Sequence, residues 1–253
     1  RVALAQVNPT VGDLEGNTRK VLEYLDHARS FQADLVAFPE LVLTGYPPED
    51  LLLNTALIRD NQTMLKKIVS SSQDIGLIIG YVDAQDHELY NAAAIVWNGE
   101  QVGVYHKIFL PNYGVFDEER YFKAGTTCPV YVIQGTGVGV NICEDIWHAV
   151  GPIPVQRDAG AEVIININGS PYQSGKAQSR ELMLSTRAKD NDLFIAYVNT
   201  VGGQDELVFD GASTIFDHDG GLVARGMQFK EDLIVVFLQK LLRFVVVPEF
   251  VLE

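Results

Sequence analysis

The centre of the chain reads Val138-Gly139-Val140-Asn141-Ile142-Cys143-Glu144-Asp145-Ile146-Trp147, an apolar run that ends abruptly in a cysteine and two acids. The run has the length and composition of a buried strand. A cysteine at the exposed end of such a strand is placed to attack a substrate rather than to fill a core. Free cysteines are more often buried as small hydrophobic side chains. The interpretation of Cys143 as a nucleophile therefore depends on what the rest of the chain provides.

Strand-like and helix-like segments alternate on both sides of this run. Strands are predicted at residues 2–7, 35–38, 77–81, 92–97, 101–105, 130–133, 163–167, 194–198, 214–216, 222–225 and 233–238. Apolar residues at helical spacing predict four helices: one capped by Asn17 or Thr18, one over about residues 57–69, one that ends at Gly160, and one from Ala177 to about Asn191. The alternation is typical of sheets that are covered by helices.

Turn signals between some of these strands decide how the sheets are built. Asn98-Gly99 between two strand-like runs is a strong signal for a β-hairpin, and Asp217-His218-Asp219-Gly220 is interpreted as another turn. Such hairpins argue against an all-parallel barrel, whose strands need a crossover after each one. The sequence therefore predicts an α/β fold with two mixed sheets packed face to face and helices outside, a four-layer α-β-β-α sandwich in one domain over residues 1–240.

Composition excludes several classes of function. The chain of 253 residues carries a formal net charge of −14, which argues against nucleic-acid and anionic-membrane partners because both need clustered Lys and Arg. No apolar run approaches the about 20 residues that span a membrane, and the chain opens on a strand-like run rather than a signal peptide. Cys128 and Cys143 form no disulfide framework, and the five histidines show no metal-ligand spacing. We expect a cytoplasmic protein with reduced thiols and no metal site.

Three residues with useful chemistry each follow a predicted strand. Glu40 follows residues 35–38, Lys107 follows residues 101–105, and Cys143 follows the central run. Active sites of sheet proteins collect at strand ends, where loops vary over a rigid frame. Taken singly, a glutamate or a lysine in a loop is expected to face water. Taken together, the three residues form a chemically complete set for a thiol nucleophile.

The chemistry of this set is amide hydrolysis. A free thiol has a pKa of about 8.5, so little of it is thiolate at neutral pH, and Glu40 is suited to remove its proton. Lys107 and the backbone N–H of Glu144 are placed to stabilise the oxyanion of the tetrahedral intermediate, and such a donor is worth about 3 kcal/mol. Glu40 would then protonate the leaving amine and activate the water that cleaves the thioester.

The same three segments carry a family resemblance. Phe38-Pro39-Glu40, His106-Lys107-Ile108-Phe109-Leu110-Pro111 and Ile142-Cys143-Glu144-Asp145-Ile146-Trp147 resemble, in order, the signature segments of the nitrilase (carbon–nitrogen hydrolase) superfamily. The resemblance spans nearly the whole chain. It implies an α-β-β-α sandwich and a triad in which Glu40 is the base, Lys107 the oxyanion donor and Cys143 the nucleophile.

Within that superfamily the chain is most similar to the glutaminase domain of the glutamine-dependent NAD synthetases. The segments that carry this similarity lie at residues 4–13, 44–51, 110–113, 170–172 and 202–211. The resemblance implies hydrolysis of L-glutamine to glutamate, with ammonia sent through a tunnel to a synthetase domain. That domain, which uses ATP and Mg²⁺, would amidate an adenylated nicotinic acid dinucleotide.

The resemblance also implies supporting roles. Glu118 matches an additional acid that positions the triad lysine and the substrate, and its neighbour Glu119 is a rival for that role. The implied substrate contacts are Tyr113 and Glu144 for the α-amino group of glutamine, with Ser170 and Lys176 for the rest of the molecule.

One family feature is missing from the sequence. The synthetase domain binds ATP on a phosphate loop that contains Ser-Gly-Gly, and no such segment is found. Gly135-Thr136-Gly137-Val138-Gly139 is no substitute, because a dinucleotide fingerprint needs its third glycine at Val140; we interpret this stretch as a hairpin turn. The chain is therefore expected to be a glutaminase domain without its synthetase domain. Residues 241–253 are interpreted as a tail that packs on this domain or a neighbouring subunit, or as the start of a linker.

Two other functions fit parts of the sequence. A stand-alone amidase or carbamoylase acting on another amide would use the same triad, and only the segments around Tyr46, Tyr113 and residues 204–209 favour glutamine. A non-catalytic assembly module would keep the fold without the reaction. The resemblance further implies a homo-oligomer, since these sandwiches commonly pair through a helix face.

Overall fold

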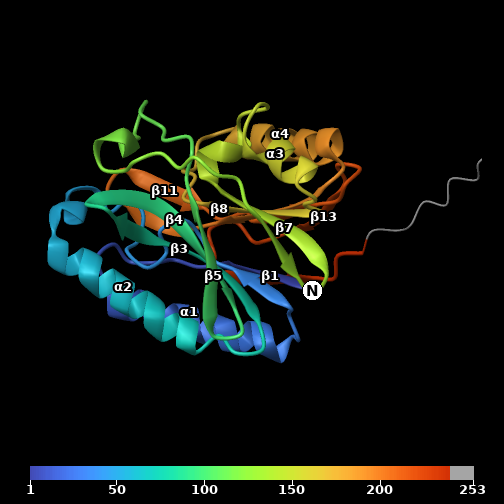
Figure 1. The fold of residues 1–253 in the computed structure, drawn as a ribbon. Coiled ribbons are helices and arrows are strands. Elements are labelled where there is room, and N and C mark those ends of the chain that lie inside the picture. Colours follow the sequence, from blue (N-terminus) through green and yellow to red (C-terminus); the bar gives the residue numbers. More distant parts are fainter. Residues whose placement is uncertain (240–253) are drawn as a thin grey trace, which may run out of the picture.

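Two six-stranded sheets form the centre of the computed structural model, which describes residues 1–239 (Figure 1). The first sheet has the order β14-β1-β2-β3-β4-β5, with strands β1 (Val2–Gln6), β2 (Leu35–Ala37), β3 (Gly76–Gln85), β4 (Glu88–Trp97), β5 (Glu100–His106) and β14 (Asp232–Val236). The second has the order β13-β12-β9-β8-β7-β6, with strands β6 (Val130–Ile133), β7 (Thr136–Ile142), β8 (Val163–Asn168), β9 (Phe194–Asn199), β12 (Thr214–Phe216) and β13 (Leu222–Arg225).

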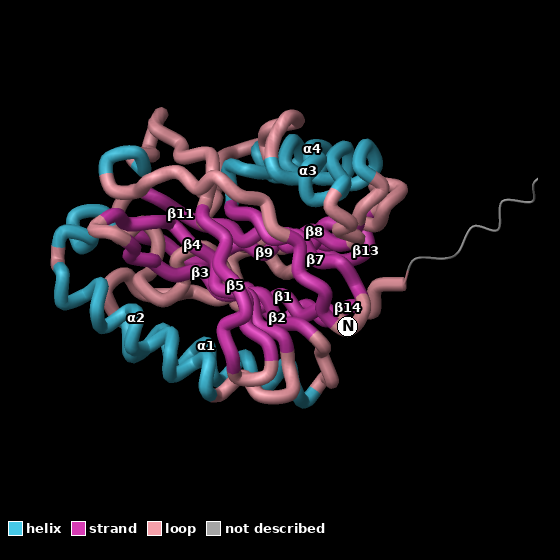
Figure 2. The backbone as a smooth tube through the Cα atoms, viewed as in Figure 1, coloured by secondary structure: helices cyan, strands magenta, loops and turns pink. Residues whose placement is uncertain are grey.

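Four helices cover the outer faces of these sheets. Helices α1 (Leu14–Ser30) and α2 (Thr55–Ser70) lie along the first sheet, and α3 (Pro152–Asp158) and α4 (Lys176–Asn191) lie along the second (Figures 1 and 2). The order of the layers is helix, sheet, sheet, helix. The predicted α-β-β-α sandwich is therefore confirmed.

Both sheets are mixed, as the hairpin signals predicted. Strands β1, β2 and β3 run parallel and so do β7, β8 and β9, whereas the flanking strands pair antiparallel. A separate hairpin, β10 (Val201–Gln204) and β11 (Leu207–Asp210), stands beside the second sheet. Within each sheet, parallel neighbours place their carboxyl ends at the same edge, and the loops after β2 and β7 leave from such edges.

The main core lies between the two sheets. Alternate residues of each strand point into it, among them Leu4, Ile78 and Ile95 from the first sheet and Val140 and Ile165 from the second. These side chains are fully buried. Each contributes about 1.5–3 kcal/mol to folding by leaving water. This apolar centre holds the two sheets at a fixed separation, and the loops that carry the candidate site are built on that frame.

The tight turns lie where glycine permits a left-handed backbone. Asn98 and Gly99 have φ values of 50° and 80°, which is the geometry of the predicted hairpin between β4 and β5. In the glycine-rich stretch at 135–139, only Gly135 lies in a turn, together with the preceding Gln134. Gly137 already lies inside β7. A Cβ at Gly137 would lie 2.1 Å from the carbonyl oxygen of Gly160, so this glycine serves packing rather than turning.

The start of α1 differs from the prediction. The helix begins at Leu14, and Asp13 caps it by accepting a hydrogen bond from the backbone N–H of Gly16 at 2.8 Å. Asn17, which was predicted as a cap, instead lies buried in the helix and hydrogen-bonds to Thr10 and Leu43. Asn17 therefore has the residue type of a helix cap, but its side chain makes tertiary hydrogen bonds instead.

Three predictions about the whole chain are left open. Residues 241–253, predicted as a tail or linker, lie outside the described residues, so the domain boundary at 240 stays a prediction. The oligomeric state and the cytoplasmic location also stay predictions. Within residues 1–239, no helix is both long and apolar enough to cross a membrane.

Candidate active site

The three sequence-predicted catalytic residues follow strands of both sheets. Glu40 lies in the loop after β2 and Lys107 follows β5, both in the first sheet, while Cys143 follows β7 in the second. Gly80 of β3 lets the Glu40 loop approach closely, because a Cβ there would lie 2.4 Å from the backbone of Pro39 and Leu41. Glu40 and Lys107 are completely buried.

Lys107 holds two carboxylates. Its Nζ donates to Oε1 of Glu40 at 2.7 Å and to Oε1 of Glu118 at 2.8 Å. Glu118 comes from the short 3-10 helix η2 (Glu118–Arg120) and is buried, whereas Glu119 is exposed and lines a surface hollow with Phe109. Glu40, Lys107 and Glu118 thus form a buried cluster, and Glu119 lies outside it.

Burial and mutual charge set the protonation states of this cluster. Burial alone would lower the pKa of Lys107, but the carboxylates of Glu118 and Glu40 outweigh it and hold that pKa well above the usual value. Burial raises the pKa of Glu118 to about 7, against the opposing effect of Lys107. Lys107 is therefore charged at neutral pH, and Glu118 changes its charge within the physiological range.

Cys143 opens the short 3-10 helix η3 (Cys143–Ile146) with a φ of 44°, a left-handed backbone that is uncommon for a side chain other than glycine. The residue was predicted at an exposed strand end, but only 4% of its surface is exposed. Burial, and after it the charge of Glu40, raises the thiol pKa well above the usual value. At neutral pH the thiol is protonated, so its reaction with an electrophile needs a base.

Asp145 braces the turn from β7 into η3, and sequence reasoning missed it. Its buried carboxylate accepts hydrogen bonds from the hydroxyl of Tyr105 at 2.7 Å and from the backbone N–H groups of Phe109 at 2.9 Å and Ile142 at 3.1 Å. Burial raises the Asp145 pKa to about 6, so it is largely ionised at neutral pH. These bonds tie the loop of Lys107 to the loop of Cys143.

A pocket of about 610 Å³ opens over Cys143. All four predicted substrate contacts line it together with the thiol: Tyr113, Glu144, Ser170 and Lys176. The hydroxyl of Tyr113 donates to Oε2 of Glu144 at 2.9 Å, which joins two of them into one polar wall. Burial lowers the pKa of Lys176. The pocket thus has an acidic wall and a basic residue, which suits an amino acid zwitterion.

Three further groups hold the carboxylates, and the sequence argument did not assign them. The side-chain amide of Asn91 in β4 donates to Oε1 of Glu40 at 2.7 Å, and the backbone N–H of Gly169 donates to Oε2 at 2.7 Å. The hydroxyl of Tyr46 donates to Glu118 at 3.0 Å. A polar residue inside an apolar strand was the only available signal for Asn91; the contact of Gly169 is made by the backbone and leaves no trace in the sequence.

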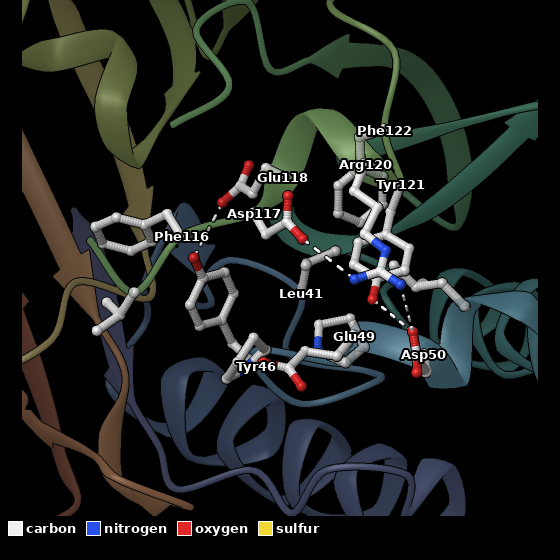
Figure 3. A pocket seen from close by; sticks show the side chains of 14 residues that line it. Leu41, Tyr46, Glu49, Asp50, Phe116, Asp117, Glu118, Arg120, Tyr121 and Phe122 are labelled. Carbon is white, nitrogen blue, oxygen red and sulfur yellow. Dashed lines mark hydrogen bonds and ion pairs between the residues drawn. The ribbon is translucent and has the colours of Figure 1, made fainter. Parts of the chain in front are cut away.

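A second cavity, of about 190 Å³, lies on the Tyr46 side of the cluster (Figure 3). Tyr46 and Glu118 point toward each other across it, and its outer part carries Arg120 beside Asp117 and Asp50. Glu118 thus links the catalytic cluster to a second opening. Within residues 1–239, no three His, Cys, Asp or Glu side chains are grouped as a metal site would require.

Comparison with known proteins gives a consistent result. The family model described as carbon-nitrogen hydrolase matches residues 1–244. A glutamine-dependent NAD(+) synthetase of Thermotoga maritima is 48% identical over 241 residues, which are 94% of this chain and 42% of that relative. The chain therefore spans less than half the length of this relative. The resemblance to these synthetases is confirmed.

Solved structures agree with this result. The glutamine-dependent NAD+ synthetase of Acinetobacter baumannii, solved with adenosine diphosphate, is 40% identical with a TM-score of 0.86; the match covers 92% of this chain and 44% of that one. A mutant of an amidase from Nesterenkonia, of the nitrilase superfamily, is 22% identical with a TM-score of 0.84, over 94% of this chain and 91% of that one. The second comparison concerns the fold alone.

Proposed function

The chain belongs to the carbon–nitrogen hydrolase family, and we propose that it hydrolyses the side-chain amide of L-glutamine through a thioester on Cys143. The observation that carries this proposal is the buried cluster of Glu40, Lys107 and Glu118, which lies beside a buried thiol at the floor of a pocket. Burying these charges is costly unless they are paired and used. A hydrolase needs this arrangement because the thiol is protonated at rest.

The first half of the reaction forms the thioester. The Glu40 carboxylate removes the thiol proton as Sγ of Cys143 attacks the amide carbon, and the carbonyl electrons move onto the oxygen. Lys107 has three N–H groups, of which two bind carboxylates, so the third is available to the oxyanion. When the intermediate collapses, the C–N bond breaks, Glu40 returns its proton to nitrogen, and ammonia leaves.

The second half releases glutamate. Glu40 takes a proton from water, and the oxygen of that water attacks the thioester carbon. The C–S bond then breaks, and the thiolate of Cys143 recovers the proton from Glu40. Glu118 takes no proton in either half; it orients Lys107, and Tyr46 holds it in place.

The walls of the pocket select the substrate. We assign the α-ammonium group of glutamine to Glu144, which Tyr113 orients, and the α-carboxylate to Ser170 and Lys176. The two ends of the zwitterion would then meet opposite charges, while the side chain extends to Cys143. An amide without these charged groups would lose both contacts.

The ammonia is proposed to serve a synthetase domain. This proposal rests on the names of the relatives, glutamine-dependent NAD(+) synthetases that are more than twice as long as the matched region. ATP and Mg²⁺ would be used by that domain. The hydrolase itself would need no cofactor.

The test is ammonia release from L-glutamine, L-asparagine and simple amides by the wild-type protein and by Cys143→Ala. We expect a preference for glutamine and a loss of at least about 10³-fold in kcat in the variant, because the nucleophile is absent. Cys128→Ala is the matched control and should retain wild-type activity, since Cys128 lines no part of the pocket over Cys143.

Two results would contradict the proposal. Equal activity of the wild type and Cys143→Ala would exclude the nucleophile. A preference for simple amides over glutamine would leave the hydrolase but remove the link to NAD synthesis, and would favour a stand-alone amidase.

A further inference from the structure

Asn91 contacts both carboxylates of the catalytic cluster. Its side-chain nitrogen lies 2.7 Å from Oε1 of Glu40 and 3.4 Å from Oε2 of Glu118. Among residues 1–239, only Asn91 and Lys107 hydrogen-bond to both acids. An amide nitrogen carries two N–H groups, so one can serve each carboxylate.

The two polar atoms of the Asn91 side chain differ in their surroundings. The residue is completely buried, and its Oδ1 has no hydrogen-bond partner in the described part of the chain. A buried polar atom without a partner costs folding free energy, which an apolar side chain of the same size would avoid. Only the nitrogen of this amide therefore offsets the cost of burial, and it does so by hydrogen-bonding to the two acids.

The charge of the cluster explains why the donor is neutral. Two carboxylates share one ammonium group, so the buried cluster is already short of positive charge. A second cation would neutralise it and compete with Lys107 for Glu40. The amide supplies hydrogen bonds without a charge, and it leaves the third N–H of Lys107 free for the substrate.

We propose that Asn91 is a positioning residue: its amide holds Glu40 in the orientation of the base and ties it to Glu118. This inference rests on the proposed function, in which Glu40 accepts the proton of Cys143. The backbone supports it, because the carbonyl of Asn91 accepts the N–H of Lys107 at 2.9 Å and so fixes the donor in register with the lysine. Among the described residues, Asn91 has no hydrogen bond to the thiol and does not line the pocket over Cys143.

Two substitutions test this role: Asn91→Leu removes the hydrogen-bond donor, and Asn91→Asp replaces the amide with an acid. Asn91→Leu keeps the branched shape, is larger, and has no donor; losing the hydrogen bonds to the charged carboxylates favours the protonated form, so the charge of the cluster should be lost at a higher pH. Asn91→Asp keeps the shape but adds a third acid, which should move that loss further in the same direction.

Asn61→Leu is the matched control. Asn61 is also completely buried, its nitrogen donates one bond of 2.7 Å to the carbonyl of Val82, and its Oδ1 also lacks a partner. It lies in α2, outside the catalytic cluster. Its replacement should change thermal stability without displacing the pH profile.

The experiment measures two profiles between about pH 5.5 and 9, a range that brackets the titration of a buried carboxyl. One is kcat/KM for ammonia release from L-glutamine. The other is the rate at which iodoacetamide alkylates Cys143, measured by mass spectrometry of peptides so that alkylation of Cys128 is counted separately. For Asn91→Leu we expect kcat to be at least about tenfold lower than in the wild type and KM to stay within about threefold. In both profiles, the decline on the acidic side should move to a pH that is higher by about half a unit or more.

The outcomes separate this inference from the proposed function. If Asn91→Leu or Asn91→Asp folds and both of its profiles decline at the same acidic pH as those of the wild type, the proposed role of Asn91 is wrong. If Asn91→Leu does not fold, Asn91→Asp decides. If the wild type hydrolyses no amide, the proposed function fails, and the alkylation profile alone still decides whether Asn91 holds the base.

Discussion

At the scale of single residues, Glu118 is a member of the buried cluster whose charge changes near neutral pH. Burial raises its pKa to about 7, so it is ionised above that pH and protonated below it. When ionised it attracts Lys107, and in the proposed mechanism it orients the ammonium group toward the substrate oxyanion. Protonation removes this attraction. Acidification should therefore weaken catalysis before it unfolds the protein.

The substitution Glu118→Gln tests this account. Glutamine resembles the protonated acid at every pH, so we expect kcat/KM to fall by about 10–100-fold at pH 8 and to lose the decline that the wild type shows as pH falls through about 7. Steady-state ammonia release across this range checks it. Glu119→Gln is the control, because Glu119 is exposed and lies outside the cluster. A pH profile of Glu118→Gln that matches the wild type would contradict the role.

For single residues, the available signals were the residue type and a place directly after a predicted strand. Glu40, Lys107 and Cys143 were selected on that basis, and the structure places the charges of Glu40 and Lys107 near the Cys143 thiol. Asn91 and Asp145 were missed because key partners lie far away in sequence: Glu40 is 51 residues from Asn91, and Tyr105 is 40 residues from Asp145. No local pattern reports a contact between two strands or two loops that only the fold brings together.

At the scale of elements, the start of α1 shows where sequence signals compete. Asp13, Asn17 and Thr18 are all residue types that cap helices, and the apolar spacing alone does not choose between them. The structure assigns the cap to Asp13 because Asn17 bonds to Leu43, in the loop after Glu40. Helix α1 is thus anchored to the catalytic loop by a side chain that resembles a cap.

Asp13→Ala checks this assignment. The substitution removes the acceptor for the N–H of Gly16 and should lower the free energy of unfolding by about 1 kcal/mol. Chemical denaturation monitored by circular dichroism measures the change. Glu15→Ala, in the same first turn, is the control and should cost less, since Glu15 makes no capping bond. An equal loss in the two variants would place the cap elsewhere.

Hairpins were the elements that the sequence predicted best. Asn98-Gly99 and Asp217–Gly220 join antiparallel neighbours as expected, because the left-handed turn conformation itself demands those residue types. The parallel neighbours β7, β8 and β9 are joined by long connections through helices, and the residues of those connections carry no local signal that predicts which strands pair. Their order became visible only in the structure.

At the scale of the whole molecule, the candidate active site is assembled across the two sheets. The first sheet supplies Glu40 and Lys107, the second supplies Cys143, and the core between them keeps these parts in register. Asp145 bonds to groups from both sides of this junction. The sandwich was predictable from its alternating elements, whereas the meeting of the sheet ends was inferred from the family resemblance and from chemical completeness.

The central claim is that Cys143 forms a thioester with glutamine. Its most direct test is rapid acid quenching of the protein mixed with L-glutamine, followed by mass spectrometry of the peptides that contain Cys143 and Cys128. The account predicts a glutamyl adduct on Cys143 that hydroxylamine removes, no adduct on Cys128, and none in Cys143→Ala. Turnover of glutamine with no adduct on Cys143, together with turnover by Cys143→Ala, would contradict it.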